Sequence, residues 1–173
     1  MSTSTDQVAS VANAGRSYER YAWVSLFAFF IIIFLRGIIP AIFGGGSQAS
    51  SGLKTLTGFT WDQISTQYPG FATFITGVTR EVGLGFVGYA LLGMAITGRS
   101  YRRCERWAWY TLWFAPVFVL SLMALVLTNA EGGGTYPANS GLLTLDIILL
   151  ALTLIGLILP IRRFFPKSPT DST

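Results

Sequence analysis

The sequence contains no histidine and only one cysteine, Cys104. Without histidine, the chain cannot form a bis-histidine haem site, a histidine-based zinc or iron site, or a Ser-His-Asp triad. A single cysteine also excludes an intrachain disulfide. A metal site would have to be built from carboxylates alone, and few carboxylates lie near each other in the chain. We therefore predict that the protein has no cofactor and is not an enzyme.

Charged residues are scarce as well. They make up 12% of the 173 residues, against about 25% in a typical soluble domain, while hydrophobic residues make up 51%. This composition indicates an integral membrane protein. The net charge of +4 would suggest a nucleic-acid partner in a soluble protein, but here the basic residues flank hydrophobic runs. We predict the lipid bilayer as the partner and no nucleic acid.

Four stretches are long and apolar enough to cross a membrane as α-helices, since a bilayer core of ~30 Å requires about 20 residues. In the first stretch, Pro40 and the glycines from Gly44 to Gly46 should end the helix. The N-terminal tail is too polar for a cleavable signal peptide. The predicted fold is an all-α, antiparallel bundle of four transmembrane helices within residues 21–163. Its approximate spans are 21–43, 77–98, 107–127 and 142–161, with polar tails at 1–20 and 164–173.

The longest predicted connection runs from Ser47 to Gly70. It begins with glycine and serine and then carries large apolar residues at roughly helical spacing. We interpret it as a short amphipathic segment at the outer membrane interface, with aromatic rings at headgroup depth. An ordinary loop with anchoring aromatic residues is the alternative. The residues concerned are Trp61, Ile64, Tyr68 and Phe71.

The distribution of lysine and arginine predicts the orientation. Of the 12 Lys and Arg residues, nine lie near the two ends of the chain or between the second and third spans, whereas only Lys54 lies in the other connections. Because cytoplasmic segments are rich in Lys and Arg, both termini are predicted to lie in the cytoplasm, with the spans in the cell membrane. The nine are Arg16, Arg20, Arg99, Arg102, Arg103, Arg106, Arg162, Arg163 and Lys167.

Gly83, Gly85 and Gly88 match the dinucleotide-binding pattern G-x-G-x-x-G. That mechanism requires a preceding strand and an open helix N-terminus that receives a pyrophosphate. Here the glycines lie inside a predicted transmembrane helix. We therefore interpret them as small residues that allow another helix to approach closely.

A string of arginines followed by aromatic residues precedes the third span. Anionic lipids attract each arginine at the cytoplasmic surface by ~1 kcal/mol, and Trp and Tyr favour the membrane interface. We predict that the string anchors the protein at the cytoplasmic interface, with contact to an anionic headgroup or a partner protein as the alternative. It consists of Arg102, Arg103, Arg106, Trp107, Trp109 and Tyr110.

The region around this string reads Tyr101-Arg102-Arg103-Cys104-Glu105-Arg106-Trp107-Ala108-Trp109-Tyr110. It resembles a signature of a family of small bacterial four-helix integral membrane proteins with no established activity. The resemblance covers roughly Trp61 to Pro116 and includes Arg80 followed by Gly83 in the second span. In the family the position of Cys104 is usually glycine, so the cysteine is not expected to be a shared functional residue. The resemblance implies the four-helix architecture and no particular reaction.

Four charged residues fall inside the predicted spans, two cations and two anions. A charge at the bilayer centre costs ~2.5–3.5 kcal/mol on insertion scales, so such residues usually pair or line a polar cavity. With a helical rise of ~1.5 Å per residue, all four lie about 20–25 Å from the cytoplasmic ends of their helices. We predict a polar cluster that opens outward and binds a ligand. The four are Arg36, Arg80, Glu81 and Asp146.

Within this cluster, Arg36 and Asp146 are the expected cross-helix pair, because bonding of a guanidinium to a carboxylate offsets much of the insertion cost. The alternative is that Arg80 and Glu81 only mark the outer end of the second helix and extend toward water. The sequence alone leaves both possibilities open.

The sequence does not identify an activity. Small size and the lack of catalytic groups favour a non-enzymatic membrane subunit or scaffold that binds a membrane-protein partner or a second copy of itself. A small carrier or pore for an ion, lipid or small amphiphile, using the polar cluster, is the alternative. An intramembrane enzyme with Glu81 and Asp146 as acid and base is less favoured, because no nucleophile, metal set or cofactor motif accompanies them.

Overall fold

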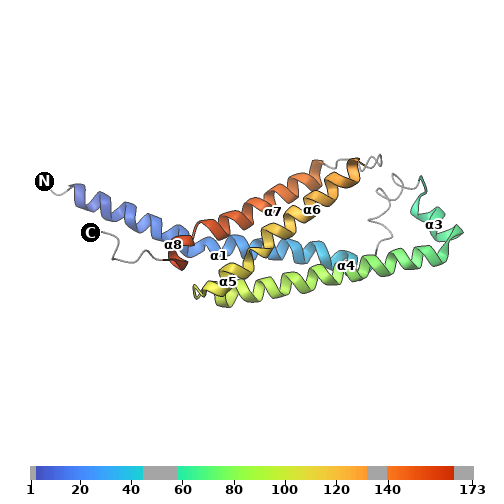
Figure 1. Cartoon of the computed structure of the whole chain (residues 1–173), viewed down its shortest axis with the longest axis horizontal. Coiled ribbons are helices and arrows are strands. Elements are labelled where there is room, and N and C mark those ends of the chain that lie inside the picture. Colours follow the sequence, from blue (N-terminus) through green and yellow to red (C-terminus); the bar gives the residue numbers. More distant parts are fainter. Residues whose placement is uncertain (1–2, 45–57, 132–139, 166–173) are drawn as a thin grey trace.

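The computed structural model of the chain is helical throughout the parts that it describes (Figure 1). These are residues 3–44, 58–131 and 140–165, and for 3–20, 126, 128–131 and 140–142 only the backbone is described. No β-strand occurs among them. The elements are α1 (Thr3–Phe43), α3 (Trp61–Gln67), α4 (Pro69–Ile96), a π-helical turn (Thr97–Tyr101), α5 (Arg106–Leu112), α6 (Phe114–Glu131), α7 (Ser140–Ile158) and α8 (Ile161–Phe164).

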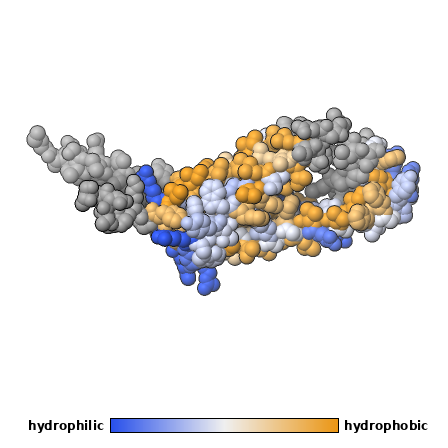
Figure 2. All heavy atoms as spheres, viewed as in Figure 1, coloured by the Kyte–Doolittle hydropathy of each residue, from blue (hydrophilic) through white to orange (hydrophobic). Residues whose placement is uncertain are grey.

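Within the described residues, four segments are long and apolar enough to cross a membrane, which agrees with the predicted number of spans. Figure 2 shows apolar side chains over the middle of the molecule and hydrophilic residues gathered toward its ends. This distribution is typical of helices whose middle parts lie in hydrocarbon. The segments are Tyr21–Phe43, Pro69–Tyr101, Arg106–Leu125 and Leu143–Phe164.

The first span belongs to a longer helix than the sequence indicated. α1 begins at Thr3, so the predicted polar tail of residues 1–20 is helical from Thr3 onward. No proline interrupts this stretch, and its alanine, glutamine, glutamate and arginine residues favour a helix. α1 ends at Phe43, the predicted last residue. Gly44 follows with a φ of 68°, a left-handed conformation that commonly ends helices.

The second span also begins earlier than predicted, because α4 starts at Pro69 and not near residue 77. Proline is favoured in the first helical turn. The N–H groups of that turn have no partner within the helix, so the missing N–H group of proline costs no hydrogen bond, and its φ is already helical. Threonine hydroxyls in the following turns donate hydrogen bonds to carbonyls four residues earlier, which satisfies them within the helix. These residues are Thr73, Thr76 and Thr79.

Part of the predicted amphipathic connection is helical. α3 is a short helix whose start is stabilised by a capping box: the Gln63 backbone N–H donates to the Thr60 hydroxyl, and the Thr60 backbone N–H donates to the Gln63 side chain. Ile64 is buried on one side of it. Residues 45–57 of this connection, which include Lys54, lie outside the described residues. So do 132–139 before the fourth span, 166–173 of the C-terminal tail, and residues 1–2.

Two prolines interrupt the last two spans, which the sequence analysis treated as continuous helices. Pro116 has no N–H group to donate to the Leu112 carbonyl, and the helix breaks at Trp113 between α5 and α6. Pro160 likewise separates α7, which ends at Ile158, from the short helix α8. A hydropathy pattern does not register these breaks, because the side chains on both sides of each proline are apolar.

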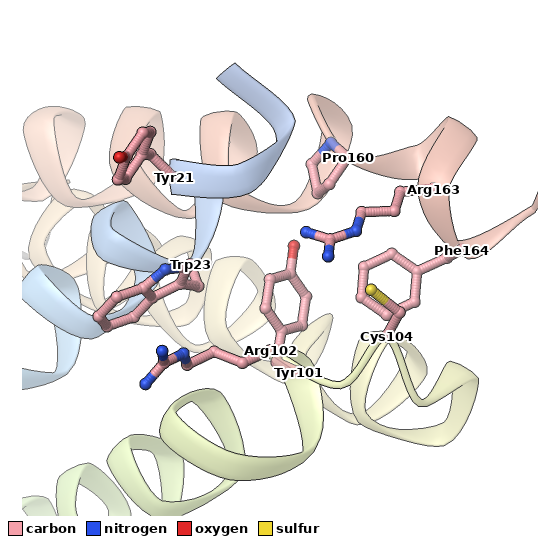
Figure 3. A pocket seen from close by; sticks show the side chains of 8 residues that line it. All are labelled: Tyr21, Trp23, Tyr101, Arg102, Cys104, Pro160, Arg163 and Phe164. Atoms are coloured by element: carbon pink, nitrogen blue, oxygen red, sulfur yellow. The ribbon is translucent and has the colours of Figure 1, made fainter. Parts of the chain in front are cut away.

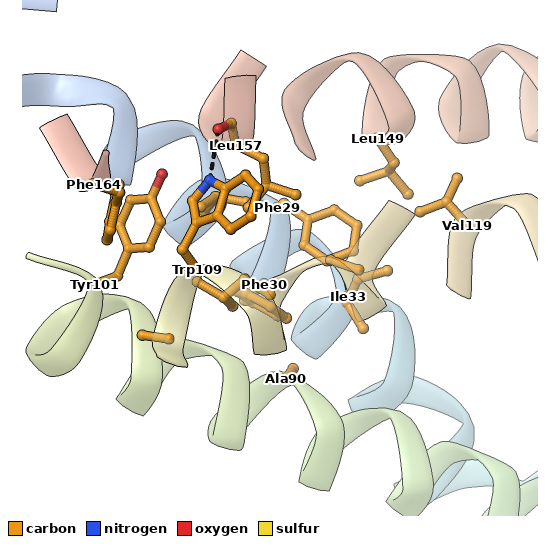
Figure 4. Close-up of a cluster of buried hydrophobic side chains, with 14 residues drawn as sticks. Phe29, Phe30, Ile33, Ala90, Tyr101, Trp109, Val119, Leu149, Leu157 and Phe164 are labelled. Carbon is orange, nitrogen blue, oxygen red and sulfur yellow. Dashed lines mark hydrogen bonds between the residues drawn. The ribbon is translucent and has the colours of Figure 1, made fainter. Parts of the chain in front are cut away.

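α1 occupies the middle of the bundle. It packs against α4 and against α7, while α6 packs against α7 (Figure 1). The core between these helices consists of large apolar side chains, with the indole of Trp109 inserted among them (Figure 4). Buried members of this core include Leu26, Phe29, Phe30, Ile33, Val119 and Leu149.

The close packing of α1 on α4 depends on glycine. A Cβ atom at Gly83 would lie 2.5 Å from the backbone nitrogen of Ala41 and 2.8 Å from the carbonyl oxygen of Gly37, closer than such atoms can approach. A Cβ atom at Gly85 or Gly88 would meet no atom within 4 Å. Of the glycines in the G-x-G-x-x-G pattern, Gly83 therefore brings two helices together, whereas the other two face outward.

We expect Gly83→Ala to push α1 away from α4 and to lower the midpoint of thermal unfolding in mild detergent. The obstructing atoms belong to the backbone of α1 and cannot give way as a flexible side chain could, so the loss should be about 1–3 kcal/mol. Gly85→Ala is the matched control, because it adds the same methyl group to the same helix in open space. Gly85→Ala should raise the free energy of unfolding by no more than about 1 kcal/mol. Equal losses in the two variants would contradict the close packing at Gly83.

Candidate functional site

Two of the four charged residues predicted inside the membrane meet across helices. Arg36 of α1 donates a hydrogen bond from Nη1 to Oδ1 of Asp146 on α7, at 2.9 Å. The Asp146 side chain is completely buried, whereas that of Arg36 is 26% exposed. Because an unpaired carboxylate is costly in apolar surroundings, the guanidinium allows Asp146 to lie there. The bond joins the first span to the fourth.

Arg80 and Glu81 do not join this pair. Both side chains are exposed, and neither forms an ion pair with a residue that the structure describes. The Nε atom of Arg80 lies 3.4 Å from where a Cβ atom of Gly44 would be, so Arg80 reaches the level at which α1 ends. The predicted cluster of four charges is therefore not assembled. Arg80 and Glu81 do not mark the outer end of the second helix either, because α4 begins at Pro69, eleven residues before Arg80.

The register of α1 on α4 explains this difference. Gly83 contacts α1 near Ala41, which places Arg80 roughly 10 Å beyond Arg36 along the helix axes at a rise of ~1.5 Å per residue. The estimate from sequence measured each residue from the end of its own helix. It could not include the offset between the two helices, because that offset is set by their contact.

One oxygen of Asp146 has no hydrogen-bond partner among the described residues. Its Oδ2 atom is buried, while Oδ1 receives the bond from Arg36. Most buried polar atoms in proteins are hydrogen-bonded, so this oxygen is available to a proton or a donor group. The Arg36–Asp146 pair is therefore a candidate site as well as a link between helices. Other buried atoms of this kind are Tyr89 OH, Thr97 Oγ1 and Trp113 Nε1.

The arginine–tryptophan string divides into an exposed part and a buried residue. Exposed side chains are a requirement for a membrane-interface anchor, since the charged and polar groups must reach the headgroups. Five of the six residues meet it, and Trp107 and Tyr110 are 51% and 60% exposed. The others of the five are Arg102, Arg103 and Arg106.

Trp109 departs from the predicted anchoring role. Its side chain is 9% exposed and lies in the core, where Nε1 donates a hydrogen bond to the Leu157 carbonyl at 3.0 Å (Figure 4). The helical period accounts for the difference. Trp107 and Tyr110 are three residues apart and share one face of α5, whereas Trp109 lies on the opposite face, toward α7.

The bond from Trp109 is part of a cap on the C-terminal end of α7. Pro160 has no N–H group, so the Gly156 carbonyl four residues earlier has no helical donor. The Tyr101 hydroxyl donates to that carbonyl instead, and Trp109 donates to the neighbouring carbonyl of Leu157. An unsatisfied buried carbonyl would cost about 1–3 kcal/mol. The two aromatic side chains therefore allow α7 to break within the core.

Sequence reasoning missed this role of Tyr101 and Trp109. A signal was present in Pro160, because a proline near the end of a span frees the carbonyl four residues before it. The donor could not be identified in the same way. Tyr101 lies 55 residues before Gly156 in the chain, and only the folding of the bundle brings the two together.

Cys104 lies in the turn before α5 and has a φ of 60°. This left-handed conformation is strained for residues with a side chain and favours glycine. Backbone geometry accounts for the position without any chemistry of the thiol.

We expect the Arg36–Asp146 pair to stabilise the bundle. Arg36→Gln leaves a buried carboxylate without its cation and should cost about 3–5 kcal/mol, measured from unfolding in mild detergent. Exchanging the residues, Arg36→Asp with Asp146→Arg, should recover much of this loss because opposite charges again face each other. Arg80→Gln removes the same charge from an exposed position and should cost no more than about 1 kcal/mol. A harmless Arg36→Gln, or an exchange that recovers nothing, would show that the pair does not hold the helices.

Tyr101→Phe removes the hydroxyl that caps Gly156 and should lower stability by about 1–3 kcal/mol. The loss should be smaller in a Pro160→Ala background, because alanine supplies an N–H group that can reach the Gly156 carbonyl. Unfolding of the two single variants and the double variant measures this coupling. Tyr110→Phe removes a hydroxyl from an exposed tyrosine of the string and serves as the matched control with little expected effect. Strictly additive losses would count against the cap.

Comparison with known proteins adds no relative. No protein-family model, no curated protein and no solved structure matches the chain. The interpretation of the candidate sites therefore rests on their own geometry. That geometry consists of an ion pair between two spans, and of an aromatic cap at the end of α7 where arginines gather.

Proposed function

We propose that the protein is a multi-pass component of the cell membrane and works as a non-enzymatic subunit or scaffold. One observation supports this above others: the polar side chains that bond across helices hold the bundle together. Arg36 and Asp146 link α1 to α7, and Tyr101 and Trp109 cap the end of α7. The most distinctive polar and aromatic residues of the chain thus serve its architecture, as expected of a scaffold.

An antiparallel bundle with both termini in the cytoplasm fits the helix contacts. Gly93 faces Phe30 and Gly83 faces Gly37, so residue numbers fall along α4 as they rise along α1. This order is the one expected for neighbouring spans that run in opposite directions. The arginines near both ends of the chain and before α5 support a cytoplasmic location for that end of the bundle.

Binding of a partner within the bilayer is supported by the outward face of α4. A Cβ atom at Gly85 or Gly88 would meet no other atom of the described chain within 4 Å. Small residues allow a second helix to approach closely, which is the main source of helix association in lipid. The partner in this proposal is another membrane protein or a second copy of the chain.

A second candidate function is a small carrier or pore that uses the Arg36–Asp146 pair. The unpartnered Oδ2 atom of Asp146 favours it, since ionisable groups within the membrane commonly mark ion or proton pathways. The partial exposure of Arg36 keeps one side of the pair accessible. Four spans in one copy would require an oligomer to surround a continuous path.

Reconstitution and extraction distinguish the two functions. Purified protein in lipid vesicles should move neither protons nor monovalent ions above the background of protein-free vesicles. Gentle extraction from the native membrane should yield a particle larger than one chain with its detergent. If the wild type shows flux that disappears in Asp146→Asn but persists in Glu81→Gln, the result would support the carrier function instead of the scaffold function. A lone monomer without flux would contradict both the scaffold and a carrier of protons or monovalent ions.

A further inference from the structure

A cavity of about 270 Å³ lies at the end of the bundle where the arginines gather (Figure 3). Its walls come from three parts of the chain that are distant in sequence: α1, the end of the π-helical turn with the residues that follow it, and α8 with the proline before it. The residues that matter for its chemistry and shape are Tyr21, Trp23, Arg102, Pro160, Arg163 and Phe164.

The cavity is positively charged. Arg102 and Arg163 contribute two guanidinium groups to its lining, and none of the lining residues is a carboxylate. Neither arginine forms an ion pair within the part of the chain that the structure describes. Two such groups beside one cavity favour an anion that accepts several hydrogen bonds, and phosphate is the common biological anion of that kind.

The surrounding fold holds both arginines at the cavity. The guanidinium of Arg102 lies over the Trp23 ring, 4.7 Å from its centroid, in a cation–π contact. Arg163 belongs to α8, which is fixed by the packing of Phe164 on Tyr101 with their ring centroids 5.0 Å apart. Tyr101 also caps the end of α7. The same aromatic contacts that close α7 therefore build the cavity.

The surroundings favour a phosphate that belongs to a lipid over a soluble one. Val24 on α1, and Ile158 and Ile161 beside the break at Pro160, adjoin the lining residues in the chain and are exposed. They offer acyl chains an apolar surface to lie on.

We propose that this cavity binds the phosphate of an anionic phospholipid in the cytoplasmic leaflet, with Arg102 and Arg163 bonded to the phosphate oxygens. The inference rests on the proposed orientation, which places this end of the bundle at a surface where anionic lipids attract arginine. The proposal changes the set of residues that the sequence predicted to contact an anionic headgroup. Arg102 is retained and Arg163 is added, whereas Arg103 and Arg106 do not line the cavity.

Lipid retention tests this site. Nanodiscs that contain phosphatidylcholine and phosphatidylglycerol with identical acyl chains supply both lipids to the full chain, and native mass spectrometry counts those that remain bound. The wild type should retain phosphatidylglycerol preferentially. The double variant Arg102→Gln with Arg163→Gln should weaken this preference about tenfold or more, because both guanidinium groups that bond to the phosphate oxygens are lost.

The matched control is the double variant Arg103→Gln with Arg162→Gln. It removes two exposed arginines from the same end of the bundle that do not line the cavity, and it should weaken the preference by less than about threefold. Equal weakening in both double variants would overturn the proposal, because it would indicate a general attraction of anionic lipid. Thermal unfolding without phosphatidylglycerol identifies a variant that does not fold, and Arg163→Gln alone then replaces it.

Two additional measurements separate the remaining outcomes. Inorganic phosphate at millimolar concentration should displace little phosphatidylglycerol, whereas complete displacement would overturn the lipid assignment in favour of a free phosphate. Cys104, the single cysteine, lines the same cavity and reports the orientation of this end of the bundle. A membrane-impermeant maleimide should label it only after the membrane is opened. Labelling of intact cells would contradict the proposed topology without changing the lipid-retention result.

Discussion

Inside a bilayer, a backbone carbonyl that loses its helical donor finds no water to replace it, and the arginine-rich end of this bundle is built around that constraint. Pro160 deprives the Gly156 carbonyl of its donor, and the Tyr101 hydroxyl takes its place. Trp109 serves the next carbonyl in the same way. Tyr101 is the last residue of the second span, and Trp109 lies near the start of the third. The break in α7 therefore links both of these spans to the end of the fourth. The cavity with its two arginines lies at this junction.

The contact between α1 and α7 depends on the same requirement that a buried polar group finds a partner within the protein, here for a charged side chain. Asp146 lies fully buried on α7 because a guanidinium from α1 reaches it. That contact requires α1 to lie beside α7, while Gly83 lets α1 also approach α4 at close range. α1 therefore contacts both the second and the fourth span, and the polar pair and the glycine contact are two parts of one packing arrangement. The Oδ2 atom of Asp146, which accepts no hydrogen bond from the described residues, is the part of the pair that could bind a proton or a donor group.

Much of the fold could be predicted from local pattern, and the errors have a common cause. The number of spans followed from hydropathy, and the pairing of Arg36 with Asp146 followed from the need to neutralise buried charge. The burial of Trp109 and the separate position of Arg80 did not follow. Each of these depends on which side of a helix faces a neighbour or on how far one helix is displaced along another.

The sequence by itself determined that four segments are apolar enough to span a membrane, and that histidine-based chemistry is absent. Both are properties of composition along the chain and require no knowledge of neighbours. The sequence also favoured the pair of Arg36 with Asp146, but only the tertiary structure separated Arg80 and Glu81 from that pair and joined Tyr101 to the carbonyl of Gly156. The physical reason is that helix register and rotation are set by packing at points such as Gly83, where the volume of one methyl group would change the distance between two helices.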